Sequence, residues 1–273
     1  MGKIRGVWIG LLALLLSGCI EVETVVKVNA DGSGTVEERV LMGAALLGLA
    51  AGMGESGSLL DQEALRRQAA TMGSGVTLQS AEAISDGPRQ GYRARYIFSD
   101  INQLRVNQNP GDKTPFPSEE EEVTPEEYIT FRFTPGNPAE LLILSEEPTF
   151  GDDAAEGLPG DPAEESDESE GGMEGMDDPD SLAMMQELFK EMRFSLVIEV
   201  AGDVVESNAS HRDGSRITMM ELDFGKLMGD FEKFQKLSTA NPQTIAEVQA
   251  MMEGVEGLKM QLEPELRVRF TPR

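Results

Sequence analysis

The sequence predicts an α+β fold: an antiparallel β-sheet or open barrel built from hairpins, with packed helices and an acidic disordered insertion. Two observations predict it. Segments in which apolar and polar residues alternate recur on both sides of short turns rich in Asp, Gly and Pro, a pattern typical of β-hairpins. In addition, residues 145–180 hold fifteen acidic residues and no Lys or Arg, which leaves too little apolar surface for this stretch to fold.

Three hairpins are expected before the acidic stretch, because runs of period two flank turn residues at three places. The hairpins and their turns are 20–42 with Asp31-Gly32, 76–98 with Asp86-Gly87-Pro88, and 126–144 with Pro135-Gly136-Asn137-Pro138. A helix is predicted over 58–72, where Gly73 supplies the stop signal. The proline-rich segment 107–125 is expected to be a polar loop.

Alternating strands and amphipathic helices resume after the acidic stretch. The expected strands are 193–200, then 203–210 and 216–223, which flank the turn at Asp213-Gly214, and finally 266–270. The expected helices are 181–192, 227–237 and 242–252. Together the elements indicate a signal peptide (1–18), the N-terminal part of one domain (19–144), the acidic linker or insertion (145–180) and the C-terminal part of the same domain (181–273).

The N-terminus has the pattern of an export signal. Lys3 and Arg5 precede an uncharged apolar run at 7–16, which is too short to span a bilayer. The motif Leu16-Ser17-Gly18-Cys19 that follows resembles the lipobox of bacterial lipoproteins. The resemblance implies cleavage before Cys19 and attachment of diacylglycerol to its sulfur, and several acyl chains give stable anchoring. An ordinary leader with an incidental cysteine is the alternative.

A lipid anchor places the protein in the bacterial cell envelope, with the membrane as a partner. In a diderm source Ile20, which is not the Asp associated with inner-membrane retention, favours the outer membrane facing the periplasm.

The body of the chain resembles the LppM-type lipoprotein domain in the order of its elements. The likeness is sharpest at Val200-Ala201-Gly202-Asp203-Val204-Val205-Glu206-Ser207-Asn208 and at Asp213-Gly214-Ser215-Arg216-Ile217-Thr218. Ala201 stands where that family has Pro, and Met219 or Met220 stands where it often has Trp. The resemblance implies one antiparallel sheet or barrel with the acidic stretch as an insertion, and it brings no enzymatic activity with it.

Composition excludes several functions. With 23 Lys+Arg against 49 Asp+Glu, the net charge of −26 repels nucleic acid, so no nucleic-acid partner is expected. A single His and a single Cys exclude a disulfide within the chain, a His or Cys metal cluster and almost every Cys/His or Ser/His catalytic pairing. His211 lies between Ser210 and Asp213, but neighbours on a tight turn rarely satisfy triad geometry. No catalytic residue, metal or cofactor is therefore expected.

The segment 41–53 is uncharged and rich in Ala, Leu and Gly, and the later helices carry methionines that adapt to irregular apolar surfaces. We expect these elements to border an apolar groove for an acyl chain or for an apolar segment of an envelope protein. The candidate residues are Leu46, Leu47, Leu49, Met53, Met185 and Met252. Burial of the same segment against the sheet is the alternative.

The sequence therefore predicts a lipid-anchored, non-enzymatic binding or assembly module, with lipid or another amphiphile as a candidate ligand. The alternatives are a hydrolase with a carboxylate-based site and a purely structural spacer.

Overall fold

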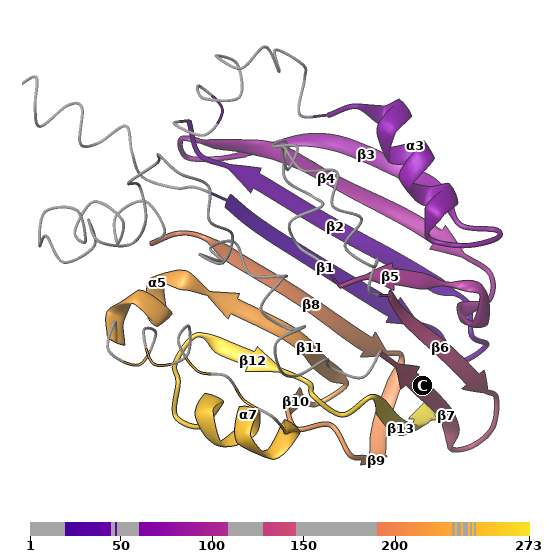
Figure 1. Cartoon of the computed structure of the whole chain (residues 1–273). Helices are drawn as coiled ribbons and strands as arrows, with labels where there is room; N and C mark the ends of the chain where they lie inside the picture. Colours follow the sequence, from indigo (N-terminus) through magenta and orange to yellow (C-terminus); the bar gives the residue numbers. More distant parts are fainter. Residues whose placement is uncertain are drawn as a thin grey trace, which may run out of the picture.

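The computed structural model describes residues 20–44, 47, 60–108, 128–145, 190–230, 233, 236, 240, 242 and 244–273. Within these ranges the strands form two sheets, which we call sheet A and sheet B (Figure 1). Neither sheet closes on itself, so the open form of the predicted architecture is the one observed.

Sheet A has eight strands in the order β10-β11-β8-β1-β2-β4-β3, with β12 also paired to β11. The strands are β1 (Ile20–Val28), β2 (Gly34–Met42), β3 (Thr77–Asp86), β4 (Arg89–Phe98), β8 (Arg193–Val200), β10 (Arg212–Asp213), β11 (Arg216–Asp223) and β12 (Leu258–Met260). Sheet B has five strands in the order β5-β6-β7-β13-β9. They are β5 (Arg105–Asn107), β6 (Tyr128–Thr134), β7 (Ala139–Leu144), β9 (Gly202–Ser207) and β13 (Glu265–Pro272).

The three predicted hairpins are confirmed. β1 pairs with β2, β3 with β4 and β6 with β7, each antiparallel across the expected turn. In β4 the buried positions alternate from Ala94 through Tyr96 to Phe98, as the period of two requires.

The structure departs from the one antiparallel sheet that the sequence predicts, because it has two sheets and one parallel pair at the centre of sheet A. β1 pairs in parallel with β8, from Glu21 opposite Arg193 to Val28 opposite Val200. A two-residue turn can join only antiparallel strands, and these two strands are far apart in the sequence, so no turn fixes their relative direction. Each sheet contains strands from before and after 146–189, since β13 also pairs with β7. The predicted domain boundaries stay predictions.

The strand predicted at 203–210 does not pair with the strand at 216–223. Instead the two-residue strand β10 pairs with β11, while β9 pairs with β13 in sheet B. The chain changes sheets at Ala201 and Gly202. Gly202 permits the crossing because a Cβ there would lie 2.3 Å from the carbonyl oxygen of Thr271.

Helices are sparse and cover sheet A at two places (Figure 1). α3 (Gln62–Thr71) lies over β3 and β4, and the Asp61 side chain caps it by accepting from the backbone N–H groups of Glu63 and Ala64. α7 (Ile245–Met252) begins after the Thr244 cap. The expected helix 227–237 begins earlier, as α5 (Phe224–Leu227), and continues in the 3₁₀ turn η5 (Met228–Asp230).

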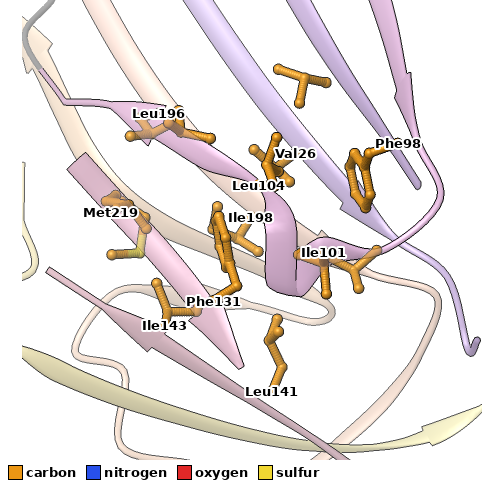
Figure 2. Packing of buried hydrophobic residues seen from close by; sticks show 14 of the residues in the cluster. Val26, Phe98, Ile101, Leu104, Phe131, Leu141, Ile143, Leu196, Ile198 and Met219 are labelled. Carbon is orange, nitrogen blue, oxygen red and sulfur yellow. The ribbon is translucent and has the colours of Figure 1, made fainter. Parts of the chain in front are cut away.

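The main core lies between one end of sheet A and sheet B. It includes apolar residues of both sheets, of α3 and of the 3₁₀ turn η1 (Ile101–Gln103), which links β4 to β5. Figure 2 shows that Val26, Leu196 and Ile198 of sheet A face the same cluster as Phe131, Leu141 and Ile143 of sheet B. All are nearly inaccessible to solvent. Burial of this shared apolar surface is what holds the two sheets together.

Several predicted features lie outside the described residues. They are the signal peptide 1–18, Cys19, residues 109–125 of the predicted loop, residues 126 and 127 of the third hairpin, residues 146–180 of the acidic stretch, residues 181–189 of the predicted helix 181–192, and the groove candidates Leu46, Leu49, Met53 and Met185.

Replacing Gly202 with Ala should destabilise the fold, because the new Cβ meets backbone oxygen at 2.3 Å and the Phe270 ring at 2.8 Å. We expect the free energy of unfolding in urea to fall by about 1–3 kcal/mol. Gly229→Ala is the matched control, since nothing lies within 4 Å of its Cβ position. Equal stabilities for the two variants would show that the sheet crossing tolerates a side chain.

Candidate functional site

A second apolar cluster lies on the same face of sheet A as the main core, at the end of the sheet where β1 begins. We call this end the entry end: it holds the start of β1, the end of β2, the β3–β4 turn, the start of β8 and the end of β11. The buried members of the second cluster are Ile20, Val22, Val40, Met42 and Phe194. Register places them side by side, because Ile20 is opposite Met42 and Val22 lies between Val40 and Phe194.

Partly buried residues of β4, of β11 and of the chain segments next to the strands complete the second cluster. Its partly buried members are Leu47, Tyr92, Met192, Met220, Leu222 and Phe224. The rings of Phe194 and Phe224 meet edge to face, with centroids 6.4 Å apart. No described residue of sheet B belongs to this cluster, whereas all five strands of sheet B contribute to or pack against the main core. The entry end of the inner face therefore lies beyond sheet B.

A buried carboxylate lies between the two clusters. Glu38 is 0% exposed and points inward from the middle of β2, with Thr24 of β1 and Ala94 of β4 as its cross-strand neighbours. The Gln68 amide nitrogen lies 3.1 Å from each Glu38 carboxylate oxygen. A buried carboxylate is tolerated only when hydrogen bonds replace its water.

Tyr96 joins Glu38 and Gln68, and we call these three residues the polar cluster. The Tyr96 hydroxyl oxygen is 3.0 Å from the Gln68 side-chain oxygen and 3.3 Å from a Glu38 carboxylate oxygen, so its single proton is donated to one of these acceptors at a time. Gln68 reaches the sheet because it shares the buried stripe of α3 with Leu65, Ala69 and Met72. The hydrogen bonds thus fix α3 to the middle of sheet A.

Tyr92 stands where the polar cluster meets the second apolar cluster, and it packs against both apolar clusters. Burial raises the pKa of Tyr92 well above its usual value, and the nearby Glu38 carboxylate raises it further. The pKa of Tyr96 is raised for the same reasons, in the same order. Both phenols therefore stay protonated and can donate hydrogen bonds at any physiological pH.

The outer face of sheet A carries charged pairs beside the buried side chain of Leu41. At the entry end the Glu21 carboxylate accepts from Arg39 and, at 2.9 Å, from Arg89. Arg89 also pairs with Asp86 at 2.6 Å. Such partly exposed pairs contribute little stability individually.

Sequence reasoning missed the polar cluster, although a signal was present. Glu38 has the same parity as Val36 and Val40 in β2, so a strict alternation places it on the buried face. Gln68 likewise follows Leu65 by three residues on one helix face. The partnership of the two residues depends on how α3 packs, which no local pattern specifies.

The structure places two of the predicted groove residues. Leu47 is half-buried against the second cluster, and its backbone N–H donates to the carbonyl of Gly43 at 3.1 Å. Met252 is half-buried at the end of α7 and belongs to neither cluster. The predicted groove as a whole stays a prediction.

The described ranges contain no helix that is both long and apolar enough to cross a bilayer. In the same ranges, no three or more His, Cys, Asp or Glu side chains are grouped so that they could hold a metal ion.

Comparison with known proteins gives one weak likeness. No family model and no curated protein matches the chain. Among solved structures, the chain is similar to the NMR structure of the folded domain of the Mycobacterium tuberculosis LppM protein, with a TM-score of 0.35 and 9% sequence identity. The match covers 93% of this chain and 92% of that chain.

The raised tyrosine pKa values predict alkaline unfolding. In the unfolded chain tyrosine ionises near pH 10, whereas the buried phenols of Tyr92 and Tyr96 stay protonated in the folded protein. The free energy of unfolding is therefore unaffected by these tyrosines below about pH 10. Above about pH 10 it falls by roughly 1.4 kcal/mol per pH unit for each tyrosine that ionises only on unfolding. Urea unfolding between pH 9 and 11.5 measures this slope, and Tyr96→Phe should lower it by one tyrosine's share. An unchanged slope in Tyr96→Phe would contradict the buried, protonated assignment.

Proposed function

We propose that the protein is a lipid-anchored, non-enzymatic binding module of the bacterial cell envelope, and that it holds an acyl chain or a similar apolar group at the second cluster. The observation that carries this proposal is the composition of the entry end. The second cluster lies beyond sheet B among the described residues, and it includes the adaptable side chains of Met42, Met192 and Met220.

An amphiphile suits this site because apolar and polar groups meet there. The apolar part of the ligand would pack against the second cluster, and the protonated Tyr92 phenol at its margin would donate to a polar head. Leu47, which is partly buried on the cluster, comes from the uncharged segment that the sequence singles out.

The buried carboxylate favours a binding role over hydrolysis. A catalytic acid or base must come within hydrogen-bond reach of a substrate. Glu38 is 0% exposed, and Gln68 lies within hydrogen-bond distance of both its oxygens. We therefore assign Glu38 to the positioning of α3 on sheet A.

The anchor is tested by replacing Cys19, the single cysteine of the chain, with Ser. We expect metabolic labelling by radioactive palmitate to disappear and the protein to leave the membrane fraction, because one acyl chain or none gives only weak membrane binding. Met184→Ser serves as the control, since it leaves the lipobox intact. Labelling that persists in Cys19→Ser would refute the anchor.

Binding is tested in a soluble Cys19→Ser form with a fluorescent fatty acid. A charge at Leu47 should weaken binding at least tenfold, about 1.4 kcal/mol, while the melting temperature changes little, because Leu47 is only half-buried. Leu142→Asp is the matched control: this leucine is also half-buried but belongs to neither cluster.

Two results would contradict the binding proposal. One is the absence of any fatty-acid binding by the parent protein. The other is unfolding of Leu47→Asp, which would identify Leu47 as an ordinary core residue.

A further inference from the structure

We infer that the entry end of sheet A lies directly against the lipid bilayer and that sheet B points away from it. This inference rests on the proposed lipid anchor at Cys19 and goes beyond it, because an anchor alone leaves the orientation of a domain open.

The first argument is the length of chain between the anchor and the fold. β1 begins at Ile20, which is only 4% exposed and pairs with Met42. Neighbouring Cα atoms are about 3.8 Å apart, so a lipid on Cys19 is attached one residue from a buried position of the sheet. A flexible tether would let the domain turn freely above the membrane. Here no residue is left to form one.

The second argument is the chemistry of the entry end. Leu47, Met192 and Phe224 are only partly buried there, on the second cluster. The charged groups there include Lys226, whose side chain is 54% exposed and whose ammonium group is 3.5 Å from the Asp223 carboxylate. They also include Asp86, which is 55% exposed and pairs with Arg89 at 2.6 Å. Apolar side chains beside a long cationic one suit the boundary between acyl chains and phosphate headgroups.

The third argument is the direction of the strands. β1 has nine residues, so at about 3.3 Å per residue its far end lies roughly 26–30 Å from Ile20. Figure 1 shows β1 and β8 running together from the entry end toward sheet B, where the C-terminus also lies. With the entry end on the bilayer, the outermost part of the domain is sheet B and the turn between β10 and β11.

Two turn glycines provide a matched pair of reporter positions. Gly87, in the β3–β4 turn, lies at the entry end, and Gly214, in the β10–β11 turn, lies at the opposite end. Their φ angles are +59° and +58°, and nothing lies within 4 Å of either Cβ position, so a cysteine introduces the same strain at both. Gly229 offers a third position, exposed and open, six residues after β11 ends at the entry end and on the other side of β1 from Gly87.

The experiment uses the full lipid-modified chain in vesicles of phosphatidylethanolamine and phosphatidylglycerol. Each variant, Gly87→Cys, Gly229→Cys or Gly214→Cys, has one reactive thiol, because the sulfur of a lipidated Cys19 is a thioether. The thiol carries a fluorophore, and the vesicles contain a lipid with a spin label in its headgroup. Vesicle flotation is measured first and fluorescence quenching second, and thermal unfolding confirms that each variant is folded.

We expect Gly87 and Gly229 labels to be quenched at least about threefold more than the Gly214 label, since the β11 strand separates the two ends by some 25 Å. Equal quenching at Gly87 and Gly214, or no quenching at any position in protein that floats with the vesicles, would overturn the orientation and leave the anchor intact. Protein that fails to float would overturn both.

Discussion

The parallel pairing of β1 with β8 is the contact on which the rest of the structure depends. β1 brings the β1–β2–β4–β3 side of sheet A, and β8 brings the β11 side with β10 and β12. Without their pairing over eight positions, each side would expose a sheet edge with unsatisfied backbone groups. The same pairing positions the start of β9, because the backbone N–H of Ala201 donates to the carbonyl of Val28 at 2.8 Å where the chain leaves for sheet B.

Glu38 and its cross-strand neighbour Thr24 divide the inner face of sheet A into two regions, which pack against different parts of the chain. On one side, aliphatic and aromatic residues pack against sheet B and form the main core. On the other side, the second cluster packs with segments at the ends of strands and with α5. A carboxylate held by Gln68 marks the boundary and fixes α3 above it. Buried polar groups whose hydrogen bonds are all made specify one arrangement, because any shift of α3 would leave a buried donor or acceptor without its partner.

The sequence indicates which segments become strands and leaves open how the strands meet. The hairpins at 20–42, 76–98 and 126–144 are local, so alternation and turn residues suffice to predict them. The parallel β1–β8 pair and the crossing of β9 join residues far apart in the sequence, and no local pattern encodes them. The short strands β5 and β12 have three residues each, too few to show a period. The candidate site follows the same rule: Leu47 is predicted as a groove residue from its apolar segment, whereas the partnership of Glu38 with Gln68 depends on packing.

Acyl-chain binding at the second cluster and contact of the entry end with the bilayer support each other, because both involve the same end of sheet A. Different experiments test them. An acyl chain that leaves a bilayer for a protein in water exposes its methylenes, at about 0.8 kcal/mol for each one. If the entry end lies against the bilayer, the second cluster is already at the interface, and a chain can move from lipid to protein without full exposure to water. The proposed orientation depends on Ile20 being buried next to the proposed anchor, whereas the proposed binding depends on the packing of Leu47 and its neighbours. A domain with the proposed orientation and no ligand would be a membrane-seated structural module. One that binds fatty acid without the orientation would take its ligand from solution.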